Sequence, residues 1–158
     1  MEILKALRPI EEFERKLALF YEWCGRSFAD DYETSSFFYC MKVEEESHIN
    51  LVQYIRRIAR QNPLLFGEVD LDMDGIQAST AKMTRLMTSA GEPALADILN
   101  LAVEIERNGT DYFGFEHITE AGPGVAQLLG SLQKSFLTHY EILVKFRAKQ
   151  IHEQLIAG

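Results

Sequence analysis

The chain has 158 residues, 47% of them hydrophobic and 25% charged, which is typical of one globular domain over residues 1–158 and excludes a disordered protein. A net charge of −8 disfavours nucleic-acid binding, and no apolar run reaches the ~18 residues that a membrane span needs. The N-terminal residues also lack the apolar stretch of a signal peptide, so a cytoplasmic protein is expected.

Proline and glycine residues divide the chain into helical segments joined by connections of unequal length. Four long helices are expected, over residues 8–28, 32–61, 92–120 and 125–154. Asp30 and Asp31 are candidates for the N-cap of the second helix. Between the second and third helices, residues 64–75 are expected to form a loop and residues 76–88 a short helix. The sequence therefore predicts an all-α four-helix bundle with a long crossover that carries a short helix.

Each long helix has an apolar stripe at spacings of three and four residues, and ionisable side chains interrupt each stripe. Representative apolar positions are Ile10, Leu17, Phe38, Val52, Leu99, Ala102, Leu132 and Leu143. The ionisable positions are Glu14, Glu45, His48, Glu106 and His139. In an antiparallel bundle these side chains could meet at a similar height inside the core, and the stripes offer no lysine or arginine to neutralise them.

A group of buried carboxylates needs a partner, because each one costs several kcal/mol when left unpaired and neighbouring ones repel each other. A divalent cation removes this penalty, and mixed carboxylate and imidazole ligands suit iron, manganese or zinc. Any one of these residues taken singly is more commonly a solvated glutamate or a satisfied core histidine. Their occurrence on all four stripes favours a metal site.

The two halves of the chain share this spacing. The pattern that begins at Glu14 is repeated at Glu106, and the Glu-x-x-His of residues 45–48 corresponds to the Phe-x-x-His of residues 136–139, roughly ninety residues later. Two helix pairs related in this way would place two half-sites face to face.

The pattern resembles the rubrerythrin-like branch of the ferritin-like superfamily, over about residues 9–150. The resemblance rests on residues 14–21 of the first helix, 44–48 of the second and 102–106 of the third. It implies a ferritin-like four-helix bundle with a carboxylate-bridged di-iron site. The implied ligands are Glu14 and His48 on one metal, Glu106 and His139 on the other, and Glu45 as a bridge.

Phe136 departs from the family pattern, because it stands where a second bridging glutamate is expected. With one bridging carboxylate missing, the second metal should bind more weakly. The expected cofactor is therefore iron, as one or two ions, with zinc or manganese as alternatives. The family implies a non-haem iron oxidoreductase that oxidises ferrous iron or reduces peroxide or dioxygen. Phe136 also leaves open a degenerate binding or scaffold module without redox catalysis, or a structural zinc site.

The implied partners follow from what the chain lacks and from the family. The chain has no Cys-x-x-Cys pair of the kind found in a rubredoxin-like iron domain, so a separate electron donor is expected. The family often forms dimers, and Phe37 and Tyr39 are candidate exposed residues of a homodimer interface.

Three further features carry alternative interpretations. Tyr21 lies two turns beyond the first glutamate, and is either a residue near the metal site or a core tyrosine with one hydrogen bond. Asp70–Gly75 resembles the first half of an EF-hand loop, but Ala81 stands where a bidentate glutamate is required. A polar turn is therefore expected there, with weak calcium binding as the alternative. Cys24 and Cys40 lie among apolar residues and are expected to be buried thiols.

Overall fold

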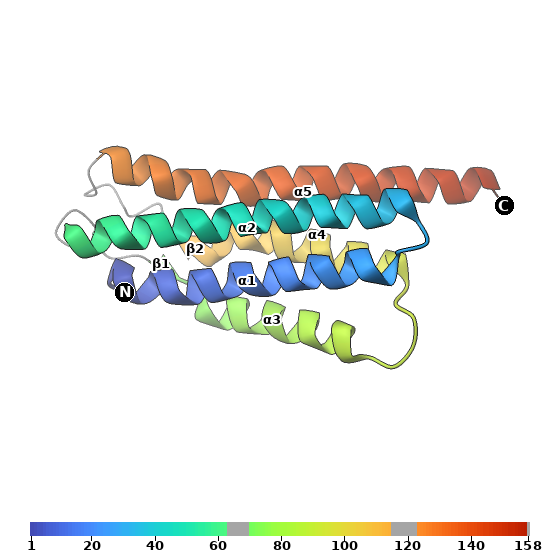
Figure 1. Ribbon diagram of the computed structural model, residues 1–158, viewed down its shortest axis with the longest axis horizontal. Helices are drawn as coiled ribbons and strands as arrows, with labels where there is room; N and C mark the ends of the chain where they lie inside the picture. The colour runs from blue at the N-terminus through green and yellow to red at the C-terminus, as the bar shows by residue number, and fades with distance from the viewer. Residues whose placement is uncertain (63–69, 115–122, 158) are drawn as a thin grey trace.

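The chain is mainly α-helical in a computed structural model that describes residues 1–62, 70–114 and 123–157 (Figure 1). Its elements are α1 (Ile3–Ser27), α2 (Tyr32–Gln61), β1 (Asp70–Leu71), α3 (Met73–Thr88), α4 (Leu95–Tyr112), β2 (Phe113–Gly114) and α5 (Pro123–Ala157). The helical class expected from the sequence is confirmed, with one short antiparallel pair of strands added. Among the described residues, every helix is too short or too polar to cross a bilayer.

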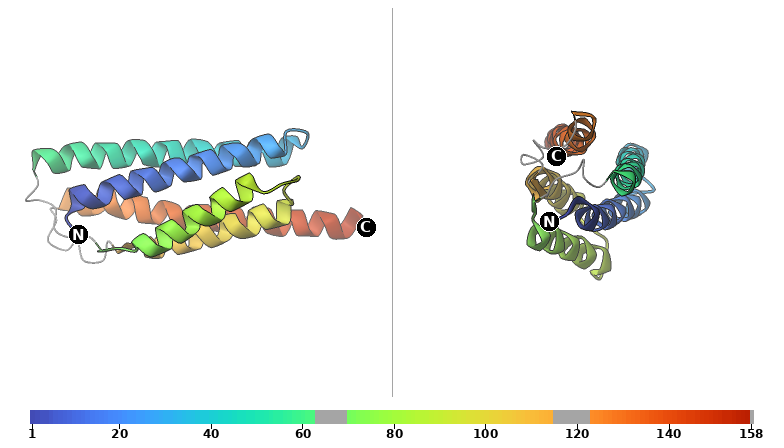
Figure 2. Two further views of the ribbon diagram at one scale, coloured as in Figure 1. Left: turned by 90° about the horizontal axis from the view of Figure 1, so that it is seen from below. Right: turned by 90° about the vertical axis from the view of Figure 1, so that its left-hand side faces the viewer.

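The four long helices α1, α2, α4 and α5 run side by side, and α3 packs outside them against α1 and α4 (Figure 2). α2 runs antiparallel to α1, and α3 then carries the chain back along the long axis. As a result, α4 runs in the same direction as α2, and α5 in the same direction as α1. α1 packs most extensively with α2, and α4 packs most extensively with α5.

α1 begins at Ile3, earlier than the start predicted at residue 8, and it contains Pro9. A proline inside a helix removes one hydrogen bond and costs about 3 kcal/mol. The extra turn nevertheless buries the side chains of Ile3 and Leu7, and fully burying such a side chain contributes about 1.5–3 kcal/mol. This burial offsets the cost of the proline, which is why the predicted boundary was wrong.

α2 spans the predicted range, and the structure distinguishes its two candidate caps. Asp31 is the N-cap, because its Oδ1 accepts a hydrogen bond from the backbone N–H of Thr34 at 3.2 Å. Its Oδ2 accepts a second hydrogen bond, from the Thr34 hydroxyl, at 2.6 Å. Asp30 precedes this capping position.

From residue 70 onward, the connection between α2 and α4 has more regular structure than predicted. Residues 70–75 were expected to be a loop, but β1 pairs with β2, and the Asp72 carboxylate accepts a hydrogen bond from the Gly75 N–H at 2.9 Å to cap α3. The Asp72 carboxylate of the EF-hand-like segment thus serves as a helix cap. Residues 64–69 lie outside the described residues.

The third long helix is shorter than predicted and the fourth is longer. α4 begins at Leu95 and ends at Tyr112, where the chain enters β2, although a helix over residues 92–120 was expected. The last part of that range, residues 115–120, lies outside the described residues. α5 extends slightly beyond both predicted ends, and its C-terminal end projects past the other helices (Figure 1).

The predicted apolar stripes form the core, and the eight representative positions named above are all buried.

Two predictions about the exposure of single residues were wrong. Cys24 is buried but Cys40 is exposed, because it points away from the stripe of α2 that contains Phe38 and Met41. Phe37 is partly buried within its own chain, since its ring stacks on that of Phe146 with centroids 3.8 Å apart.

Candidate metal centre

The five polar residues predicted from the stripes come together inside the bundle. They are Glu14 from α1, Glu45 and His48 from α2, Glu106 from α4 and His139 from α5. The three glutamates are 0% exposed, and the two histidines are 6% and 3% exposed. These residues are hereafter called the core cluster. Bulk water is therefore excluded from groups that are ordinarily charged.

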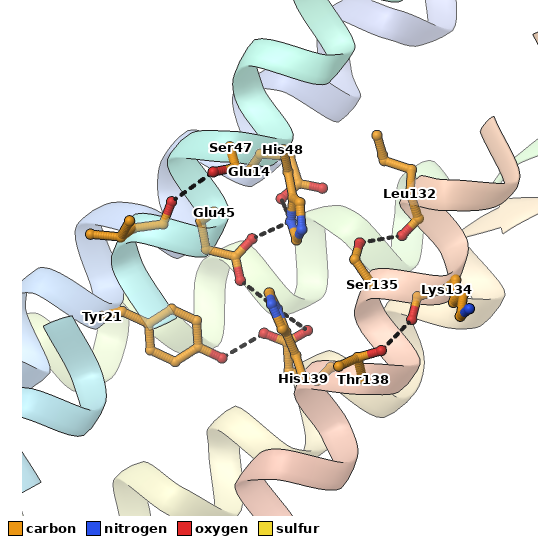
Figure 3. A network of polar contacts seen from close by, with 12 residues as sticks. Glu14, Tyr21, Glu45, Ser47, His48, Leu132, Lys134, Ser135, Thr138 and His139 are labelled. Carbon is orange, nitrogen blue, oxygen red and sulfur yellow. Dashed lines mark hydrogen bonds and ion pairs between the residues drawn. The ribbon is translucent and has the colours of Figure 1, made fainter. Parts of the chain in front are cut away.

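Glu45 lies at the centre of the core cluster, between the two imidazoles (Figure 3). Its Oε2 is hydrogen-bonded to His48 Nδ1 at 2.9 Å. Its Oε1 lies 3.0 Å from His139 Nδ1. The two imidazole rings are stacked at a tilt of 27°, with their centroids 5.0 Å apart. One carboxylate therefore divides its two oxygens between two histidines on different helices.

Each histidine also faces one outer glutamate. His48 Nδ1 is 3.4 Å from Glu14 Oε2, and His139 Nδ1 is 3.7 Å from Glu106 Oε2. The core cluster thus consists of two half-sites that share Glu45. The internal repeat predicted two half-sites face to face, and these contacts bring the two groups of residues together. In the part of the chain that the structure describes, the ion pairs of these three carboxylates run to histidines alone.

Several buried polar atoms of the core cluster have no hydrogen-bond partner. They are both carboxylate oxygens of Glu14, Oε1 of Glu45, Oε2 of Glu106 and Nδ1 of His139. The contact between Glu45 and His139 is short but is not aligned as a hydrogen bond. Buried polar atoms are nearly always satisfied in proteins, so a cluster of unsatisfied oxygens in one place needs an explanation. A cation among them would supply the missing interactions.

The electrostatics of the core cluster follow from burial and proximity. Burial raises the pKa of Glu14 and of Glu106, and the charge of Glu45 raises both further. Burial also favours an uncharged Glu45, but interactions with His139 and His48 hold its pKa below the usual range. Burial alone would lower the pKa of both histidines, yet the adjacent carboxylates raise the pKa of each to about 10. Without a metal, the folded core cluster therefore retains protons at neutral pH.

Tyr21 is a buried core tyrosine that contacts the core cluster through a hydrogen bond. Its hydroxyl donates a hydrogen bond of 2.6 Å to Glu106 Oε1. The side chain is fully buried, and burial together with the charge of Glu106 raises its pKa well above the ordinary value. Tyr21 thus fixes the orientation of one outer glutamate.

Phe136 is fully buried on α5, one helical turn before His139, and its ring centroid is 6.4 Å from that of His48. It packs directly on α4 at Gly109, where an added Cβ would lie only 2.3 Å from Phe136 Cδ1. Sequence reasoning did not assign a role to Gly109. The signal was a glycine on the inward stripe of a helix, where it costs about 1 kcal/mol relative to alanine.

The donor atoms of Glu45, His48 and His139 all lie within 4.8 Å of one another, so this buried group could hold a metal ion. Its ligand types are compatible with several transition metals. No protein-family model matches the chain, and no curated protein or solved structure is significantly similar to it. The function of the chain is therefore inferred from the geometry of the site.

Proposed function

We propose that the chain is a ferritin-like metal-binding protein that holds iron, as one or two ions, in the core cluster. The observation that carries this proposal is the set of buried carboxylate oxygens without hydrogen-bond partners, contributed by three different helices. The directions of the four long helices, with α3 returning the chain along the bundle, also suit a ferritin-like bundle with one long crossover.

The residues present fit a divalent transition metal. Glu14 and His48 would hold a cation on one side, Glu106 and His139 on the other, and Glu45 would be shared. Carboxylate oxygen with imidazole nitrogen suits iron, while zinc and manganese remain the alternatives. The protein's own part is to keep the ligands dry and oriented, and Tyr21 does this for Glu106 through its hydrogen bond of 2.6 Å.

Bound iron would supply redox chemistry of the ferroxidase or peroxidase type, oxidising ferrous iron or reducing peroxide or dioxygen. In this proposal the electrons for reduction come from a separate donor protein. The proposal also includes a homodimer. Of the two candidate interface residues, Phe37 and Tyr39, Tyr39 is the exposed one. Light scattering of the purified protein tests the dimer.

Phe136 favours a second candidate function, a bundle that does not catalyse redox reactions. Phe136 occupies the position in the second half of the chain that corresponds to Glu45 in the first half. The core cluster therefore has one carboxylate fewer than two identical half-sites would have. This candidate is a structural zinc site or a scaffold that acts through its outer surfaces. It predicts no oxidation of added ferrous iron in air, whereas the first candidate predicts oxidation faster than in buffer alone.

Elemental analysis of protein purified without chelator tests metal binding. We expect about one or two equivalents of transition metal, mainly iron, and we expect Glu45→Ala with His48→Ala to abolish it. The matched control is Glu44→Ala with Ser47→Ala, which has the same spacing on the exposed face of α2. Circular dichroism checks that both variants remain helical. Stoichiometric metal in the first double variant would contradict the proposal.

A further inference from the structure

We propose that the two half-sites are unequal, and that Glu14, Glu45 and His48 bind a divalent cation more tightly than Glu106, Glu45 and His139. This inference rests on the proposed function, since it concerns the same core cluster. It goes further by naming which half takes the first ion and which side chains make the other half weak.

The two outer glutamates differ in what they can offer a cation. Glu14 has both carboxylate oxygens buried without a hydrogen-bond partner. Glu106 has one such oxygen, because its Oε1 already accepts the hydrogen bond from Tyr21 at 2.6 Å. Glu14 can therefore bind through either oxygen or both, while Glu106 can bind through both only by giving up a buried hydrogen bond.

The two histidine-bearing helices differ as well. α2 supplies a glutamate one turn before His48, whereas α5 supplies Phe136 one turn before His139. The Phe136 ring lies directly against the backbone of Gly109, so α4 is shaped to accommodate this ring. A ligand is thus replaced by packed hydrocarbon in the second half-site alone.

Charge makes the second ion bind more weakly than the first, whichever half-site is filled first. Three ionised carboxylates carry three negative charges in the core cluster, and each half-site has two of them because Glu45 is shared. A first divalent cation leaves one negative charge in total, so a second cation is attracted less.

The test is a titration of the metal-free protein with Co²⁺, followed by visible absorption and by equilibrium dialysis. For the unmodified chain we expect one Co²⁺ to bind at least about tenfold more tightly than the second. His139→Ala should keep the tight ion within about threefold in affinity and lose the weak one. His48→Ala should weaken the tight ion by about a hundredfold or more, since it removes a direct ligand.

The pair of histidine variants distinguishes this inference from its alternatives. Equal weakening by both would indicate one ion centred on Glu45 and shared by both imidazoles, and would overturn the inference. The inference would also be overturned if His139→Ala weakened the binding of the tight Co²⁺ more than His48→Ala does. If the unmodified chain binds no Co²⁺ and no iron, the proposed function itself fails.

Phe136→Glu provides an independent measurement in the opposite direction. Restoring a carboxylate to the second half-site should tighten the second Co²⁺ by at least about tenfold, while the first changes little. Circular dichroism and a urea titration establish whether this variant folds. If it folds and the second ion is not tightened, Phe136 is not the cause of the inequality and the inference is wrong.

Discussion

Glu14 lies in the core with no hydrogen-bond partner for either carboxylate oxygen, although α1 could bury an apolar side chain at that position. Burial raises the pKa of this carboxyl well above its ordinary value. Folding of the metal-free chain at neutral pH must therefore either bury a charge or take up a proton, and both reduce stability. A side chain that opposes folding in this way is typical of a functional site.

Glu14→Gln should stabilise the metal-free protein while weakening metal binding. The uncharged amide needs neither a buried charge nor a bound proton, and His48 keeps its hydrogen bond to Glu45 at 2.9 Å, so we expect the free energy of unfolding in chelator to rise by about 1 kcal/mol or more. Urea unfolding in chelator measures this, and dialysis against Co²⁺ measures the loss of binding. Glu12→Gln, at an exposed position that pairs with Arg8, serves as the control and should change stability by less than about 0.5 kcal/mol. A less stable Glu14→Gln variant in chelator would mean that this carboxylate supports the fold.

Gly109→Ala should destabilise the protein even though alanine favours helices. The added methyl group would lie 2.3 Å from Phe136 Cδ1, and the buried ring would have to move. We expect a loss of about 1–3 kcal/mol from overpacking, reduced by the roughly 0.5–1 kcal/mol that alanine contributes to a helix. Gly130→Ala is the matched control, because nothing lies within 4 Å of its added Cβ, and it should be stabilising. Equal effects in urea unfolding would contradict this account of the contact.

At the level of elements, the beginning of α2 depends on one cap. The Asp31 carboxylate accepts hydrogen bonds from the Thr34 backbone and from its hydroxyl, and these interactions lower the pKa of Asp31. The cap stabilises the first turn of α2, and α2 carries two residues of the core cluster. A cap at this turn therefore contributes to the placement of the site.

Asp31→Ala should reduce the free energy of unfolding by about 1 kcal/mol, the usual effect of losing an N-cap. Asp30→Ala, one residue earlier, is the control and should have a much smaller effect. Because the pKa of Asp31 is lower in the folded state, its contribution is present above pH 3.8 and is lost as the pH falls through the folded value. Thermal unfolding of the three proteins at neutral and acidic pH measures both effects. An Asp30 variant as unstable as the Asp31 variant would contradict the assignment of the cap.

The helices and the five polar positions could be predicted because helical periodicity is local in sequence. Glu14 and Glu106 interrupt apolar stripes, and that pattern alone placed them in the core. The early end of α4 could not be predicted, since β2 is defined by pairing with β1 some forty residues earlier along the chain. The start of α1 was predicted too late because a proline locally indicates a helix start, whereas the burial of Ile3 and Leu7 depends on tertiary packing. The hydrogen bond from Tyr21 to Glu106 could not be predicted either, because it joins residues 85 positions apart in the sequence.

At the level of the whole molecule, pH should affect the metal-free and metal-bound proteins in opposite ways. The carboxylates around His48 and His139 overcome the effect of burial and raise both pKa values from 6.5 to about 10. A raised pKa contributes stability that is complete below pH 6.5 and is lost as the pH rises through about 10. Metal binding needs neutral imidazoles and ionised carboxylates, so protons compete with it.

We therefore expect the Tm of the chelator-treated protein to fall between pH 6.5 and about 9, while the increase in Tm caused by added Mn²⁺ grows over the same range. Differential scanning calorimetry at constant ionic strength measures both. The double variant Glu45→Ala with His48→Ala should show no increase in Tm with Mn²⁺ at any pH. A metal-induced increase that shrinks with rising pH would contradict the assignment of these residues as ligands.

The core cluster is divided between two helical hairpins, and this division affects how the molecule assembles. α1 and α2 are joined by residues 28–31 and pair as neighbours, whereas α4 and α5 pair on the other side of the bundle. The N-terminal hairpin also leaves the ribosome first, and it carries Glu14, Glu45 and His48. In the proposed metal-binding role, this hairpin would offer three ligands to a cation before the second hairpin is made, and a cation bound there would act as a template on which the rest of the chain closes.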